Sequence, residues 1–81
     1  MSARQVVALV RSLCRRHGLT LDELRGRGKG SHRVYAVRDA AGEELARMTI
    51  TDHPGDLSWA VLRDIEQKLA HLFGEKWTEK R

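Results

Sequence analysis

The sequence predicts a single α+β domain in which two helices pack on one face of a small antiparallel sheet and leave the other face open. Its length of 81 residues is typical of one domain, which we assign to residues 1–81. Apolar residues recur at helical spacing near both ends of the chain, and two central segments are rich in strand-forming residues. We therefore expect the order helix, strand, strand, strand, helix, and the sequence leaves only the first strand open.

The first helix is predicted by five apolar residues that share one face. They are Val6, Val7, Val10, Leu13 and Cys14. Ser2 is a candidate N-cap, and Gly18 stands where the helix should end, after a last turn rich in cations that suit the helix dipole. Cys14 and His17 superficially resemble half of a metal site. No second pair has matching spacing, so we expect a buried thiol and a capping histidine.

The segment that follows fits two structures. Thr20 and Glu23 have capping-box spacing, which favours a short helical turn. Leu19 and Leu21 fit an edge strand equally well. The glycines at positions 26, 28 and 30 then favour a loop.

A hairpin is predicted next. Residues 31–38 and 44–51 are strand-like, and residues 39–43 form a turn between them. The alternation does not decide which face of the first of these strands is buried. Tyr35 is therefore either a core residue or a side chain on which a nucleic-acid base could stack.

The second helix is predicted from its N-cap, Ser58, to the glycine at which it should stop, Gly74. Six apolar residues recur at helical spacing between these two positions. They are Trp59, Leu62, Ile65, Leu69, Leu72 and Phe73. We expect Trp59 and Leu62 in the core, His71 on the solvated side, and Trp77 folded back onto the core.

Charge is distributed unevenly along the chain, whose net charge is +4. Residues 1–33 hold eight arginines and lysines against two acidic residues, and the remainder is slightly acidic. A polyanion such as nucleic acid is the expected partner, and the alternative is a solvated basic surface. The single cysteine, Cys14, excludes an intrachain disulfide, and no apolar run approaches the roughly 20 residues that span a membrane. We expect a cytoplasmic protein without membrane contact.

Three groups of residues carry a resemblance to a known family. They are Gly30-Ser31-His32 at the start of a strand, residues 49–54 with the sequence TITDHP, and the helix opened by Ser58. In this order the groups resemble the HicA family of small bacterial toxins. The resemblance runs from about Gly30 to Leu72, with a general match of the first helix.

The resemblance implies a fold similar to the double-stranded-RNA-binding domain and a toxin–antitoxin function. HicA-like proteins are endoribonucleases (mRNA interferases) that cleave mRNA without a metal, and a HicB-like antitoxin, usually encoded alongside, covers the site. The histidine of the Gly-Ser-His motif is essential in the family, which makes His32 the expected catalytic residue, with Gly30 and Ser31 shaping the turn before it. No cofactor is implied.

The chemistry is coherent with these residues. Metal-free RNA cleavage needs a proton acceptor for the 2′-hydroxyl and positive charge near the phosphate, and histidine suits acid–base work. We expect His32 to be the general base or acid and His53 to be a second acid–base candidate. The residues expected to bind RNA are Arg25, Arg27, Lys29, Ser31 and Arg33.

A different class of function fits the same charges. In that alternative the chain is a non-catalytic nucleic-acid-binding protein with the same fold, encoded by a phage or mobile element, and His32 only contacts phosphate.

Overall fold

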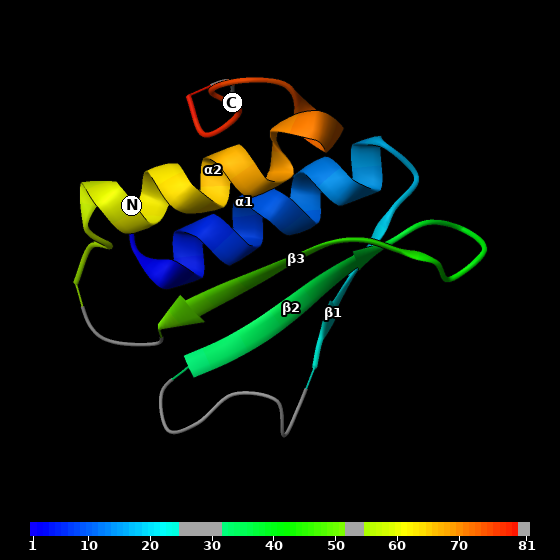
Figure 1. Cartoon of the computed structure of the whole chain (residues 1–81), viewed down its shortest axis with the longest axis horizontal. Coiled ribbons are helices and arrows are strands. Elements are labelled where there is room, and N and C mark those ends of the chain that lie inside the picture. Colours follow the sequence, from blue (N-terminus) through cyan, green and yellow to red (C-terminus); the bar gives the residue numbers. More distant parts are fainter. Residues whose placement is uncertain (25–31, 52–54, 80–81) are drawn as a thin grey trace.

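Five elements make up the fold in the computed structural model, which describes residues 1–24, 32–51 and 55–79 (Figure 1). Their bounds are α1 (Ala3–Arg16), β1 (Thr20–Glu23), β2 (His32–Arg38), β3 (Glu44–Thr51) and α2 (Trp59–Phe73). The predicted order of helix, three strands and helix is confirmed.

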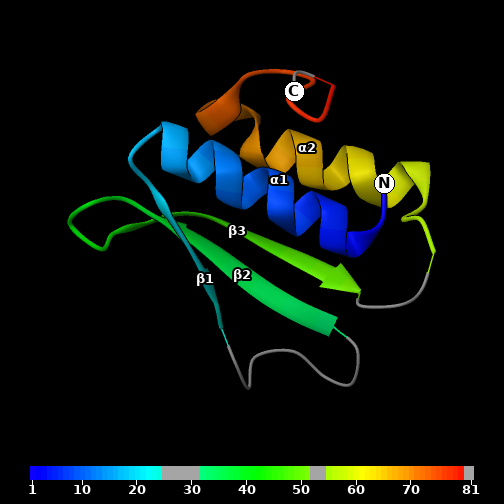
Figure 2. The same ribbon diagram turned by 180° about the vertical axis from the view of Figure 1, so that it is seen from behind.

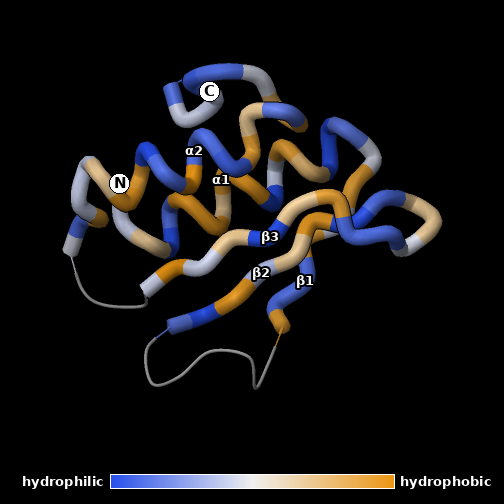
Figure 3. The backbone as a smooth tube through the Cα atoms, viewed as in Figure 1, coloured by the Kyte–Doolittle hydropathy of each residue, from blue (hydrophilic) through white to orange (hydrophobic). Residues whose placement is uncertain are grey.

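The three strands form one antiparallel sheet in the order β1-β2-β3, with β2 in the centre. Both helices lie on the same face of this sheet, and the other face is open, as the two opposite views show (Figures 1 and 2). The core fills the space between helices and sheet, where the apolar segments of both layers meet (Figure 3). Side chains at alternate strand positions therefore divide into a helix-covered face and an open face.

The helix α1 begins at a reciprocal capping box. The Gln5 amide donates to Ser2 Oγ at 3.2 Å, and the Ser2 amide donates to Gln5 Oε1 at 2.9 Å. Its apolar face is buried as predicted, except that Val7 lies half-buried at the edge. The helix ends at His17, whose amide donates to carbonyls of the last turn, and Gly18 follows at φ +68°.

The open question about residues 20–23 is resolved in favour of a strand. Leu21 pairs with Val37 on β2 and is buried in the core below α1. Arg38 Nε donates to Asp22 Oδ2 at 3.0 Å and links β1 to β2 on the open face. Burial of Leu21 and a ladder of main-chain bonds together outweigh the local capping pattern of Thr20 and Glu23, so tertiary context decides this segment.

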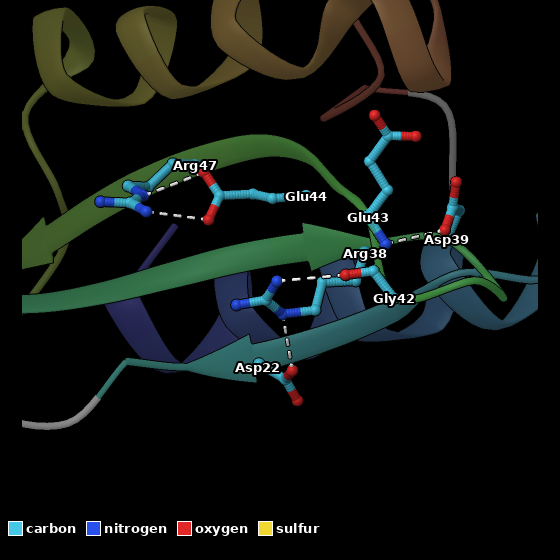
Figure 4. Close-up of polar contacts among 7 residues, drawn as sticks. All are labelled: Asp22, Arg38, Asp39, Gly42, Glu43, Glu44 and Arg47. Carbon is cyan, nitrogen blue, oxygen red and sulfur yellow. Dashed lines mark hydrogen bonds and ion pairs between the residues drawn. The ribbon is translucent and has the colours of Figure 1, made fainter.

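The turn between β2 and β3 is organised by one carboxylate. Asp39 Oδ1 accepts from the amides of Ala41 and Glu43, both at 2.9 Å, and Figure 4 shows the bond from Glu43. Gly42 in the same turn takes φ +86°. Beyond it, Val37 pairs with Ala46 but Arg38 pairs with Glu44, so Leu45 is an extra residue in β3. This bulge turns Glu44 and Arg47 toward the same face, although they are three residues apart.

The helix α2 begins at Ser58, whose Oγ accepts from the Val61 amide at 3.3 Å, and ends at Gly74 with φ +89°. Both caps match the prediction. The placement of Trp59 in the core was wrong, because this side chain is 72% exposed. Leu57, one residue before the cap, is buried instead, and the core side of α2 starts only with Leu62 and Ile65.

The segment after α2 folds back onto the core, as predicted. Trp77 is 1% exposed, its Nε1 donates to the Glu66 carbonyl oxygen at 2.8 Å, and its ring meets Phe73 edge-on at 5.7 Å. Thr78 Oγ1 donates to the Glu66 carboxylate. These contacts attach the C-terminal segment to the middle of α2.

Candidate active site and nucleic-acid interface

His32 is the first residue of β2, and its side chain is exposed. It pairs across the sheet with Thr51, the last residue of β3, and the two side chains share the open face. The distance between His32 Nδ1 and Thr51 Oγ1 is 3.3 Å. The predicted catalytic histidine therefore lies at one end of the central strand, on the face that neither helix covers.

The contact with Thr51 has a chemical consequence. A neutral imidazole carries one proton, and the two ring nitrogens then have different roles. If Nδ1 donates its proton to Thr51 Oγ1, Nε2 holds the free lone pair and can accept a proton from a substrate. The hydroxyl thus offers a way to fix both the tautomer and the orientation of His32.

Two other cations of the described strands lie on the open face, and both are paired with carboxylates. Arg38 Nε lies 3.0 Å from Asp22 Oδ2, and Arg47 Nη2 lies 2.8 Å from Glu44 Oε1 (Figure 4). The hydrogen bond and charge of Glu44 raise the pKa of Arg47. Since Ala36 on β2 sits between these two pairs in the register, the centre of the open face is nearly balanced in charge.

Arg33 lies on the helix-covered face, because neighbouring strand residues alternate between faces. Its Nη1 is 3.3 and 3.4 Å from the two carboxylate oxygens of Glu23 on β1. His32 and Arg33 were expected to act on one phosphate, but the strand sends their side chains to opposite sides. Tyr35 also faces the helices and is buried, so it is not a stacking platform on the open face.

The remaining predicted site residues lie outside the described residues. They are Arg25, Arg27, Lys29, Gly30, Ser31 and His53. Their predicted roles in RNA binding, in shaping the turn before His32 and in acid–base chemistry stay predictions.

A groove that the sequence did not reveal lies on the other side of the sheet from His32. It has a volume of about 300 Å³ and opens between α1 and the start of β2. The helix contributes Arg4, Ala8 and Arg11, and the sheet contributes Arg33, Tyr35 and Ile50. Helical spacing of Arg4, Ala8 and Arg11 is visible in the sequence, but nothing there shows that β2 brings a third arginine to the same place.

Cys14 and His17 have the structural roles that we predicted. The Cys14 thiol is buried, and this burial raises its pKa, while the charge of Arg11 acts in the opposite direction. The His17 ring packs against Phe73 at 5.4 Å between centroids, and its backbone caps α1. Throughout residues 1–24, 32–51 and 55–79, no three histidine, cysteine or acidic side chains come together as metal ligands would.

His71 is exposed, as predicted, and its Nε2 lies 3.3 Å from the Leu45 carbonyl oxygen at the bulge. Neither helix in the described part of the chain has the length and apolar character needed to cross a bilayer.

The protein-family models and the curated proteins give no relative from which a role could be transferred. The chain matches no protein-family model, and no curated protein matches it. The case for a function therefore depends on the fold and on the geometry of His32 and the arginines.

Proposed function

We propose that the chain is a HicA-like toxin, a metal-independent endoribonuclease that cleaves mRNA in the cytoplasm. One observation carries the proposal: His32 is exposed at the start of the central strand, with Thr51 Oγ1 3.3 Å from its Nδ1. The α-β-β-β-α order, which the resemblance implied, is consistent with it. In this proposal His32 is the general base or acid.

The reaction follows from the chemistry of RNA. Nε2 of His32 accepts the proton of a 2′-hydroxyl, and the resulting oxygen nucleophile forms a bond to the adjacent phosphorus. The bond from phosphorus to the 5′-oxygen breaks, and that oxygen takes up a proton. The products are a 2′,3′-cyclic phosphate and a free 5′-hydroxyl end. Cations near the phosphate stabilise the charge that develops on it.

Cleavage of a labelled RNA by the purified chain in EDTA tests this proposal. We expect His32→Ala to abolish cleavage and to abolish growth arrest when the protein is expressed in bacteria. His71→Gln is the matched control, because it removes another exposed histidine and should cleave at the wild-type rate. Cleavage by His32→Ala at the wild-type rate would contradict the proposal.

A HicB-like antitoxin is the partner that this function requires. An inhibitor that covers the open face around His32 and Thr51 would block access of RNA to the histidine. We expect the product of the neighbouring reading frame to bind the toxin and to restore growth on co-expression. Growth arrest that persists when both proteins are made would argue against such a partner.

The second candidate is a non-catalytic nucleic-acid-binding protein encoded by a phage or mobile element. One observation favours it: the cations on the open face beside His32 are paired, whereas α1 carries four arginines and no acidic residue. Salt-dependent RNA binding without any cleavage product in EDTA would select this candidate over the first.

A further inference from the structure

The unbalanced positive charge of the described fold lies on α1. This helix contains Arg4, Arg11, Arg15 and Arg16 and no carboxylate. Among the described residues, none of these four arginines has an acidic side chain within ion-pair distance. The second helix, by contrast, balances its cations with acidic residues and pairs Lys68 with Asp64. A polyanion would therefore meet its strongest attraction at α1.

Three of the four arginines lie along one flank of the helix. Arg4, Arg11 and Arg15 fall at i, i+7 and i+11, which places them within a narrow arc, and Ala8 separates the first two. At a rise of 1.5 Å per residue they span about 16 Å of helix axis. This length is enough to contact more than one phosphate of a nucleic-acid strand, which carries one negative charge per nucleotide.

The flank is also concave. Arg4 and Arg11 border the 300 Å³ groove whose other wall is Arg33, and Tyr35 and Ile50 lie between the two walls. The charge of Arg33 is compensated by Glu23. The uncompensated positive charge of the groove is therefore that of Arg4 and Arg11. Arginine presents several N–H donors in a plane, which suits phosphate oxygens.

We propose that this arginine groove binds the backbone phosphates of a single RNA strand, with Arg4 and Arg11 in direct contact. The identification of the ligand as RNA rests on the proposed function. The expectation that the groove binds phosphate rests only on its arginines. Arg33 and His32 are consecutive residues on opposite faces of β2. A strand that leaves the groove around the start of β2 is therefore led toward His32.

The test measures binding alone, in a His32→Ala background that removes cleavage. Fluorescence anisotropy of a labelled single-stranded RNA in EDTA gives Kd over a range of salt concentrations. We expect Arg4→Gln with Arg11→Gln to weaken binding about 20-fold at 0.1 M salt and to reduce the log–log salt slope by about 1.4. Arg4→Lys with Arg11→Lys keeps the charges and should keep the slope.

The matched control removes two arginines elsewhere. Arg16 is exposed on another side of α1, and Arg63 lies on α2 with its guanidinium carbon 5.0 Å from the Trp59 ring centroid. Arg16→Gln with Arg63→Gln lowers the net charge equally, and we expect its salt slope to stay close to that of the parent. Circular dichroism verifies that both double variants are folded. Equal weakening of RNA binding in the two variants would overturn the proposal that the groove binds RNA.

The groove and the ribonuclease can fail separately. A protein that binds RNA through Arg4 and Arg11 but yields no cleavage product refutes the nuclease and supports the groove. A protein that cleaves RNA in a His32-dependent way, while Arg4→Gln with Arg11→Gln leaves Kd unchanged, supports the nuclease and refutes the groove.

Discussion

His32 and Arg33 are neighbours in the chain, yet their side chains have different surroundings. His32 shares the open face with Thr51, and Arg33 shares the helix-covered side with Glu23. The alternation of a strand is the whole reason, since successive side chains point to opposite faces. Chemistry at His32 thus depends on what the open face supplies, and Thr51 Oγ1 lies there, 3.3 Å from His32 Nδ1.

Thr51→Val removes the hydroxyl and keeps the shape of the side chain. If the hydroxyl orients His32, we expect the cleavage rate kcat to fall about three- to tenfold, as loss of one hydrogen bond would give, with KM unchanged. Thr49→Val is the matched control, since Thr49 lies on the same face opposite Val34. Single-turnover cleavage in EDTA measures the effect, and equal rates for both variants would remove the positioning role.

Cys14 gives a prediction for pH. Burial raises the pKa of its thiol, so the unfolded chain loses the proton first, at about pH 8.5. Below that pH the thiol's contribution to stability is complete, and it declines as pH rises toward the folded-state pKa. We expect the difference in unfolding free energy between wild type and Cys14→Ala to shrink from pH 8 to 10. Urea denaturation measures it, and a constant difference would contradict the argument.

The connection between α1 and β1 depends on a single backbone conformation. Gly18 has φ +68°, and directly after it the Leu19 amide donates to the Cys14 carbonyl oxygen at 2.7 Å. Together they end the helix and redirect the chain into β1, where Leu21 reaches the core. The boundary of two elements is therefore fixed by one residue type.

Gly18→Ala tests this boundary. A Cβ at Gly18 meets no atom within 4 Å, so the cost is conformational only. We expect a loss of about 1–2 kcal/mol in unfolding free energy, because side chains disfavour positive φ. Gly18→Asn should lose less, since asparagine tolerates this region better. Urea denaturation compares the variants, and an alanine variant as stable as wild type would show that the turn adapts.

Elements were predictable from the sequence where caps and periodicity agreed. Ser2, Ser58 and Gly74 mark helix ends that the structure confirms. The spacing of Thr20 and Glu23 is a local signal for a helical turn. The burial of Leu21 against α1 and β2 is a long-range interaction, and it outweighs that local signal. The face occupied by Tyr35 could not be predicted, because both faces of β2 carry apolar residues and only the position of the helices separates them.

The whole molecule is stabilised by a thin core to which its two tryptophans contribute unequally. Trp77 is almost fully buried and donates a hydrogen bond to α2, whereas Trp59 is mostly exposed beside Arg63. Helical periodicity predicted Trp59 in the core because the periodicity depends only on the spacing of apolar residues along α2. It carries no information about where the sheet beneath the helix ends. The arginine groove escaped prediction for a similar reason, since it joins residues of α1 and β2 that are distant in sequence.

Substitution of each tryptophan measures this difference. We expect Trp77→Ala to cost about 3–5 kcal/mol, a large part of the roughly 4–12 kcal/mol available to a chain of this size. Trp77→Phe keeps an aromatic ring and should remain folded with an intermediate loss. Trp59→Ala should stay within about 0.5 kcal/mol of wild type. Thermal unfolding by circular dichroism tests the order, and equal losses for the two alanine variants would contradict it.

The order of the strands has a consequence for how the chain folds. Because β1, β2 and β3 are neighbours in both sequence and space, each strand pairing closes a short loop, which favours rapid folding. The main-chain contacts that join the N-terminus to the segment before α2 are different: Ser2 bridges to Asp56, and the Leu57 amide donates to the Met1 carbonyl oxygen at 2.8 Å. They close a much longer loop than any strand pairing does, so we expect them to form after the sheet and to open before it. Hydrogen exchange at the Leu57 amide, faster than exchange in the centre of β2, would report that sequence of events.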